Sequence, residues 1–274
     1  MSQERLELGV ASALEAHFGA APEVAVVLGS GLGAATGVLE DVEGRVDYAA
    51  LGLPTVGVKG HGGQVTVGRL GAVRAAFFAG RSHAYEFVGT NIEPIVRATR
   101  AVAVWGVSAL VLTASTGSLR ANLAPGTLVR LTDFIDFGFG GPLAGPPVPE
   151  RGPRFVDMSE PYCKKLRARI ARAAETTPGP HDEGVYAFSR GPAFETPAQV
   201  RALGLLGGDV VGMSTVPETL AARQMGLAVA GVSVVSNPGA GLVDGPLDHD
   251  AVLAEAGPIA ERLGLLLRAA WQTA

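Results

Sequence analysis

The chain has 274 residues, of which 47% are hydrophobic and 18% charged, and its formal net charge at pH 7 is −4. A chain of this length and hydrophobicity can bury a full core, and we expect one domain over residues 1–274 because no stretch has the composition of a linker. The composition excludes a disordered chain, and an acidic balance without blocks of lysine or arginine argues against a nucleic-acid partner.

Cys163 is the only cysteine. An intrachain disulfide and a zinc site built on thiolates are therefore both excluded. Residues 1–19 carry acidic side chains early and are typical of an amphipathic helix, without the basic start of a signal peptide. No run of about 18 apolar residues is present to span a membrane. We expect a cytoplasmic protein without a membrane partner.

The first half of the chain alternates between strand and helix patterns. After the N-terminal helix, residues 24–28 predict a strand, and residues 64–70 and 73–80 predict a hairpin around Gly71. Residues 92–106 have apolar side chains at helical spacing, and residues 108–115 and 126–137 predict two further strands. Residues 138–153 are rich in glycine and proline, which predicts a long irregular loop.

The second half continues the alternation. Residues 158–175, 197–207 and 215–226 predict helices, and residues 184–191, 209–215 and 227–237 predict strands. Residues 248–271 predict a final helix with Asp248 as its N-cap. This order predicts a single-domain α/β fold with a mixed, mostly parallel central sheet flanked by helices. Ligands in such folds bind where strands end and loops begin.

Polar side chains interrupt the apolar runs at the ends of the predicted strands. Because parallel strands end at the same edge of a sheet, we expect these side chains to gather there. They are Ser30; Arg81, His83, Tyr85 and Glu86; Ser115 and Thr116; Glu195; Met213 and Ser214; and Ser236 and Asn237.

The string GSGLG, residues 29–33, follows the first strand. A serine between glycines at the start of a helix favours an anion. One alternative is a tight turn whose glycines only permit positive φ. A second is a dinucleotide site, because Gly29, Gly31 and Ala34 fit the spacing G-x-G-x-x-A. Such a site also needs an acidic residue about 20 positions further on, at the end of a second strand, and residues 48–53 do not have the pattern of a strand end. A nucleophile elbow is excluded because Leu28 stands where it requires glycine.

The string AGRSHAYE, residues 79–86, adds groups that bind anions. Arg81 can offer a planar fork to two anionic oxygens, and His83 a further donor. His61 lies between glycines in KGHGG and is a second histidine of this kind. The alternative is a solvated surface turn.

Two further strings, GPAFET and GMSTVPE, suggest recognition of a planar ligand. The carboxylate of Glu195 can accept two hydrogen bonds from an N–H/N–H₂ edge while Phe194 covers a ring or sugar face. Alternatively, Glu195 caps the helix that starts near Pro197. Met213 could contact a ligand or, alternatively, pack in the core. The amide of Asn237 can donate and accept hydrogen bonds to a ligand or, alternatively, stabilise a turn in SNPG.

Seven strings in this order, GSGLG, GHGG, GRSHAYE, GPAFETPAQ, VGMSTVPE, SNPGAG and DHDAVL, give the chain a family resemblance from about Val24 to the last helix. It resembles the trimeric, low-molecular-mass purine nucleoside phosphorylases, whose sibling is methylthioadenosine phosphorylase. The resemblance implies their fold and a homotrimer in which Phe155 is lent to the sugar pocket of a neighbouring subunit.

The resemblance also implies a role for each matching position. The residues expected around inorganic phosphate are Ser30, His61, Arg81, His83, Ser115 and Ser214. Those expected at the sugar are Tyr85, Met213 and His249, with His249 near the 5′-hydroxyl. Those expected at the purine are Phe194, Glu195 and Asn237. The residues expected to serve catalysis are His83, Glu195, Asn237 and His249.

The implied reaction is reversible phosphorolysis in purine salvage, in which phosphate attacks C1′ of the sugar and the purine leaves. It needs no metal and no organic cofactor. Glu195 and Asn237 favour 6-oxopurine (deoxy)ribonucleosides, inosine and guanosine, because adenine would turn a lone pair at N1 toward the carboxylate. Methylthioadenosine phosphorylase, an inert module that binds nucleoside or phosphate, and a dinucleotide-dependent oxidoreductase are the alternatives.

The chain departs from the family pattern at two places. Residues 113–118 read TASTGS where these phosphorylases have T-N-A-A-G-G, so that Ser115 replaces a small apolar residue and Ala114 lacks an amide. Residues 141–145 read GPLAG in place of N-P-L-x-G. The first departure resembles the methylthioadenosine sibling more closely and bears on specificity and rate.

Overall fold

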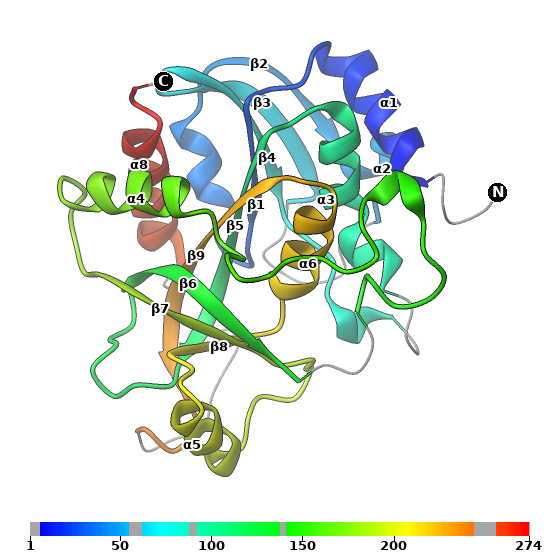
Figure 1. The fold of residues 1–274 in the computed structure, drawn as a ribbon. Helices are drawn as coiled ribbons and strands as arrows, with labels where there is room; N and C mark the ends of the chain where they lie inside the picture. The colour runs from blue at the N-terminus through cyan, green and yellow to red at the C-terminus, as the bar shows by residue number, and fades with distance from the viewer. Residues whose placement is uncertain (1–5, 55–61, 88–91, 138–140, 244–255, 274) are drawn as a thin grey trace.

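The computed structural model describes residues 6–54, 62–87, 92–137, 141–243 and 256–273, and the statements below concern these residues. Nine strands form one mixed sheet, with helices packed against both of its faces (Figure 1). The α/β class with a mixed central sheet, predicted from the alternation of patterns, is confirmed.

The elements of the first half surround β1, a strand whose five residues are all buried. In chain order they are α1 (Leu6–Phe18), β1 (Val24–Leu28), the 3₁₀ helix η2 (Gly33–Val38), β2 (Glu40–Asp47), α2 (Tyr48–Leu51), β3 (Gln64–Leu70), β4 (Val73–Ala79), the 3₁₀ helix η3 (Ala84–Glu86) and α3 (Glu93–Trp105).

The second half of the chain holds five of the nine strands. Its elements are β5 (Ala109–Ser118), β6 (Leu128–Asp136), the 3₁₀ helix η4 (Pro149–Arg151), α4 (Lys164–Ala174), β7 (His181–Phe188), α5 (Pro197–Leu205), β8 (Val210–Gly212), α6 (Val216–Gln224), β9 (Ala228–Pro238) and α8 (Ala256–Ala270).

Most predicted elements form, and a few bounds differ. The hairpin of β3 and β4 is antiparallel and turns at Gly71, whose φ of +60° suits glycine. The helix predicted over 158–175 begins only at Lys164, because Tyr162 just before it is fully buried in the core. β2 and α2 were not predicted. The described part of the predicted loop 138–153 holds only the short η4, and Asp248 lies outside the described residues.

The strand order is β2-β3-β4-β1-β5-β8-β7-β6-β9, and β9 also pairs with β5. The strands β5, β8, β7, β6 and β9 therefore close into a ring, while β2, β3, β4 and β1 extend from β5 as an open sheet. β1 is parallel to β4 and β5, and β5 is parallel to β9. β8 runs antiparallel to β5, so it is one of the antiparallel strands of the predicted mixed sheet.

One edge of β5 changes partner along its length. It pairs with β1 from Ala109 to Leu112 and with β8 at Gly117 and Ser118, and in the described part of the chain no strand pairs with this edge between them. β1 and β8 therefore diverge at residues 113–116. A point where neighbouring strands diverge leaves room for a ligand against exposed strand edges.

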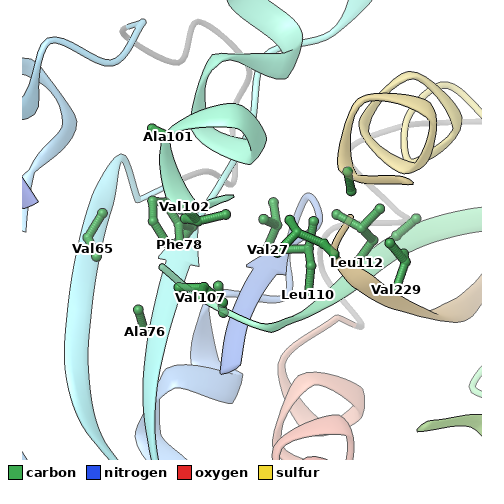
Figure 2. Packing of buried hydrophobic residues seen from close by; sticks show 14 of the residues in the cluster. Val27, Val65, Ala76, Phe78, Ala101, Val102, Val107, Leu110, Leu112 and Val229 are labelled. Atoms are coloured by element: carbon green, nitrogen blue, oxygen red, sulfur yellow. The ribbon is translucent and has the colours of Figure 1, made fainter. Parts of the chain in front are cut away.

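The apolar core lies in two layers, one on each face of the sheet. Alternate residues of β1 point to opposite layers: Ala25 and Val27 to the first, Val24, Val26 and Leu28 to the second. Helices α1, α3 and α6 cover the first layer, and η2, α4 and α8 cover the second (Figure 1). Figure 2 shows the first layer, where Val102 of α3 lies beside Phe78 of β4. This burial on both faces keeps the strands rigid beneath the site.

Candidate active site

A cavity of about 320 Å³ opens where β1 and β8 diverge beside β5. Segments that follow β1, β4, β7 and β8 and residues of β5 and β9 form its wall, so the polar side chains at the predicted strand ends do gather. The lining residues are Gly29, Ser30, His83, Tyr85, Ala114, Ser115, Thr116, Gly117, Pro192, Phe194, Glu195, Val211, Gly212, Met213, Ser214, Ser236, Asn237 and Gly239.

The turn after β1 lies directly against β5. A Cβ atom on Gly29 would stand 2.9 Å from Cα of Ala114, so glycine is required there by the neighbouring strand. Gly31 has a φ of +74°. The hydroxyl of Ser115 donates to the carbonyl oxygen of Ser30 at 2.7 Å and ties the turn to β5. The extra hydroxyl of TASTGS thus has a local acceptor.

The strand order argues against the dinucleotide alternative. That site requires a second parallel strand next to β1 that ends in an acidic residue. The neighbours of β1 are β4 and β5, whereas β2, which ends at Asp47, lies at the sheet edge and runs antiparallel to β3. Asp47 there accepts a hydrogen bond from Gln64 at 2.8 Å. The turn leads into the six-residue 3₁₀ helix η2.

Arg81 is buried behind the cavity and is not among the lining residues. Its Nη1 donates to the carbonyl oxygen of Thr113 and to Oγ of Ser214, the latter at 3.2 Å. Its Nε lies 3.3 Å from Oε1 of Glu218 in an ion pair whose two side chains are each 3% exposed. The guanidinium therefore reaches the cavity wall through Ser214.

Ser214 stands in a tight turn between β8 and α6. The N–H of Val216 donates to the carbonyl oxygen of Ser214 at 2.7 Å, and Thr215 between them has φ +58° and ψ −45°. These values describe a γ-turn. The N–H of Ser214 donates to the phenol oxygen of the buried Tyr186 at 3.1 Å. Because Arg81 already donates to Oγ of Ser214, the hydroxyl hydrogen can point elsewhere, and the cavity lies beside it.

His83 and Tyr85 form one side of the cavity. Their rings stack with centroids 5.0 Å apart and planes at 12°. Oε1 of Glu86 accepts from the N–H of His83 at 2.6 Å and lies 3.2 Å from its Nδ1. Burial raises the pKa of Tyr85 to about 12, so its phenol stays protonated. Gly191, with a φ of +65°, brings the segment after β7 against Tyr85 and Met213, where a side chain would collide with both.

Glu195, Phe194 and Asn237 also line the cavity. Oε1 of Glu195 is buried and has no hydrogen-bond partner among the described residues. The helix α5 is capped by Thr196, whose side chain accepts from the N–H of Gln199 at 3.2 Å, so capping does not explain Glu195. Phe194 is 43% exposed, as an aromatic ring at a cavity mouth can be.

The amide of Asn237 is oriented by its neighbours. Its Nδ2 donates to the carbonyl oxygen of Pro238 at 2.8 Å, and the hydroxyl of Ser236 lies 2.8 Å from its Oδ1. An asparagine amide has two N–H groups and two lone pairs, so one of each remains for a ligand. Asn237 thus has the donor and acceptor that a base edge requires, in addition to its contacts within the turn.

Nine of the predicted site residues line the cavity: Ser30, His83, Tyr85, Ser115, Phe194, Glu195, Met213, Ser214 and Asn237. Met213, for which a core position was the alternative, is among them. Arg81 lies one hydrogen bond behind the wall. Phe155 is 91% exposed and lies outside the cavity lining of its own chain. His61 and His249 lie outside the described residues.

Sequence reasoning missed two buried residues that support this wall, Glu218 and Tyr186. The string T-V-P-E at residues 215–218 has the spacing of an N-terminal helix cap and was a usable signal for Glu218. Tyr186 lies inside the apolar run of β7, where no local pattern distinguishes it from a core aromatic. It also missed Pro192 and Gly239 as lining residues.

The described residues lack both a metal-binding cluster and a membrane-spanning helix. They contain no group of three or more His, Cys, Asp or Glu side chains arranged to hold a metal ion. Nor does any helix in these segments have the length and apolar character needed to cross a bilayer.

The chain is similar to known proteins over most of its length. The profile of the phosphorylase superfamily matches residues 23–271. Purine nucleoside phosphorylase 1 of Geobacillus stearothermophilus is 38% identical over 241 residues, covering 88% of this chain and 87% of the relative.

Two solved structures superpose on almost the whole chain. A schistosoma purine nucleoside phosphorylase in complex with hypoxanthine has a TM-score of 0.87 and 30% identity, covering 97% of this chain and 96% of that one. The Schistosoma mansoni purine nucleoside phosphorylase in complex with adenosine has a TM-score of 0.88 and 30% identity, covering 98% and 97%.

Proposed function

Because the chain belongs to the phosphorylase superfamily, among its purine nucleoside phosphorylases, we propose that it acts on 6-oxopurine nucleosides, inosine and guanosine, at the cavity beside β5. The enzyme class is that of the pentosyltransferases.

The observation that carries the specificity is the buried, unpartnered Oε1 of Glu195 at the cavity wall. A buried carboxylate oxygen without a donor is unfavourable, so its position favours a ligand that brings an N–H group. Hypoxanthine and guanine present N1–H, whereas adenine presents a lone pair at N1. A hydrogen-bonding site of this kind rejects a mismatched analogue strongly because its polar groups are left unpaired.

Asn237 supports the same specificity from the other side of the base. Its remaining N–H can donate to O6, and its remaining lone pair can accept from a protonated N7. Negative charge grows on the purine as the glycosidic bond breaks, which favours uptake of a proton at N7, and the amide oxygen of Asn237 stabilises that N7–H by accepting its hydrogen bond. Phe194 is placed to cover the base or the sugar.

Phosphate is the proposed nucleophile, held by Ser30, Ser115 and Ser214 at the wall, with His83 beside them and Arg81 behind Ser214. A phosphate oxygen forms a bond to C1′ as the bond from C1′ to N9 breaks. The departing purine takes up the proton that hydrogen phosphate loses, and the products are free purine and (deoxy)ribose 1-phosphate. The proposed contribution of the protein is to align phosphate with C1′ and to stabilise charge. Inorganic phosphate is a co-substrate, and the proposal includes no metal or organic cofactor.

The remaining roles follow the family resemblance. Tyr85 and Met213 also line the cavity, and their proposed role is contact with the sugar. His61 and His249 keep their expected roles at phosphate and at the 5′-hydroxyl. Phe155, 91% exposed, suits a side chain lent to a neighbouring site in a homotrimer. Sedimentation of the active enzyme tests this, because full activity as a monomer would remove Phe155 from the site.

Purine release from inosine, adenosine and methylthioadenosine, each with and without inorganic phosphate, tests the proposal. Release from inosine that depends on phosphate is the expected result. Preferential release from methylthioadenosine would contradict the base specificity while leaving the reaction class intact. No release from any of the three would instead favour an inert module that binds nucleoside or phosphate.

A further inference from the structure

We propose that Glu218 is a positioning residue that sets the geometry of the phosphate site from behind the cavity wall. The inference rests on the proposed assignment of Ser214 and Arg81 to phosphate. Glu218 is 2% exposed and is not among the lining residues, so any effect on phosphate must pass through its neighbours.

One carboxylate connects the two parts of the proposed anion site. Oε1 of Glu218 lies 3.3 Å from Nε of Arg81, and Oε2 accepts a hydrogen bond from the N–H of Thr215 at 3.0 Å. Arg81 in turn donates to Oγ of Ser214, the residue next to Thr215. Glu218 therefore fixes both the donor to the Ser214 hydroxyl and the backbone that carries that hydroxyl.

The turn that Glu218 holds is conformationally strained. Thr215 has a φ of +58°, a value rare for a β-branched residue, and it is fully buried. Such a conformation persists only where the surrounding structure holds it in place. Two consecutive N–H groups of this turn donate to side chains, that of Ser214 to Tyr186 and that of Thr215 to Glu218.

Because Arg81 is buried, its position depends on the charge of Glu218. The guanidinium donates to the carbonyl oxygens of Thr113 and Val27, which supply no negative charge. Removing one partner of a buried ion pair leaves the other charge uncompensated, which is strongly unfavourable. We therefore expect Arg81 to move away from Ser214 when the carboxylate is replaced.

The sign of the effect separates positioning from plain electrostatics. A carboxylate this close to a phosphate site repels the anion, so its neutralisation by itself strengthens phosphate binding. A carboxylate that positions Arg81 and Ser214 has the opposite effect, and its neutralisation weakens phosphate binding. The two mechanisms therefore predict opposite changes in the KM for phosphate.

The test uses the full-length enzyme and the variant Glu218→Gln, which keeps the size of the side chain and one oxygen for the N–H of Thr215. We expect the KM for phosphate to rise about 10-fold, the effect of losing one charge-assisted hydrogen bond. The KM for inosine should change by less than about 2-fold, since Glu218 does not reach the base region. The increase in Tm produced by inorganic phosphate alone, which needs no turnover, should fall in parallel.

A second variant keeps the inference testable if Glu218→Gln does not fold. In Glu218→Asp the charge remains, but the shorter side chain cannot reach both Arg81 and Thr215. The KM for phosphate should then rise at least about 3-fold without a change in charge. An unchanged or lower KM for phosphate in whichever variants fold would overturn the inference.

Two controls separate the possible failures. Glu93→Gln replaces a buried glutamate in the first turn of α3 whose Oε2 lies 2.6 Å from Nη2 of Arg97. Glu93 is not among the residues that line the cavity, so this variant should leave the KM for phosphate unchanged. An equal effect in Glu93→Gln would overturn the inference by attributing it to lost stability. Ser214→Ala should weaken phosphate binding. If it does not, the proposed phosphate site fails; if it does and Glu218→Gln has no effect, only the role of Glu218 fails.

Discussion

Replacing Glu195 by alanine tests the proposed base specificity most directly. Oε1 of Glu195 is buried without a partner, so a base N–H that reaches it forms a bond to a charged, desolvated acceptor. Such a bond contributes about 1.5–3 kcal/mol, and leaving the N–H of the bound base unpaired costs about 1–3 kcal/mol more. A combined loss of about 3 kcal/mol corresponds to a decrease in kcat/KM for inosine of about 100-fold or somewhat more.

The assay is hypoxanthine release from inosine at saturating phosphate, with adenosine as a second substrate. Adenosine has no N1–H, so Glu195→Ala should lower the ratio of inosine to adenosine turnover as well as the absolute rate. Glu175→Ala, at an exposed carboxylate directly after α4, is the matched control and should behave as the wild type. A kcat/KM for inosine within about 3-fold of the wild type would refute the assignment, because so small a decrease is less than the loss of a typical neutral hydrogen bond, about 1 kcal/mol, would cause.

Three further changes test other parts of the structure. Asn237→Asp should shift the preference toward adenosine, since the new carboxylate accepts from a 6-amino group; an unchanged ratio of inosine to adenosine turnover would contradict the role of Asn237 at the base. Because burial raises the pKa of Tyr85 to about 12, its phenol keeps its proton at lower pH, and Tyr85→Phe should leave the shape of the kcat/KM profile from about pH 6 to 9 unchanged, whereas the loss of one limb would show that Tyr85 titrates there. Gly71→Ala should lower the free energy of unfolding by more than about 1 kcal/mol, because φ is +60° and a methyl group would overlap the carbonyl oxygen of Trp271; urea denaturation with an unchanged midpoint would contradict this.

The fold was predictable from sequence where burial dominates local pattern. β1 is apolar throughout, and its run VAVVL identifies a strand buried on both faces. β2 was missed because EDVEGRVD is polar and mostly exposed at the edge of the sheet. Edge strands carry charged side chains that suppress pairing with other molecules, and this removes the hydrophobic signal. Its pairing with β3 is accompanied by ion pairs from Arg69 to Glu40 and Asp41.

The site was predictable to the level of which segments meet, and less so for what each side chain does there. Ser30, Glu195 and Asn237 follow or end apolar runs, a pattern visible in one sequence. Arg81 has the same pattern, but its guanidinium turns inward because Glu218, from a distant helix, supplies a buried counter-charge. Contacts between distant segments leave no pattern in the local sequence. Buried residues that hold site residues in place, such as Glu218, are therefore the hardest to predict from sequence.

The sharing of β5 between the open sheet and the strand ring limits how the enzyme can move during turnover. Two-lobed enzymes close over their substrates by rotating one lobe about a hinge. Here a rotation of the open sheet against the ring would break the ladder that joins β1, β5 and β9. We therefore expect any change that admits substrate or releases product to occur in surface segments, such as the one carrying Phe194, and not in the sheet. Ser115 of β5 and Asn237 of β9 both belong to this ladder, so we expect the spacing between them to stay constant during turnover.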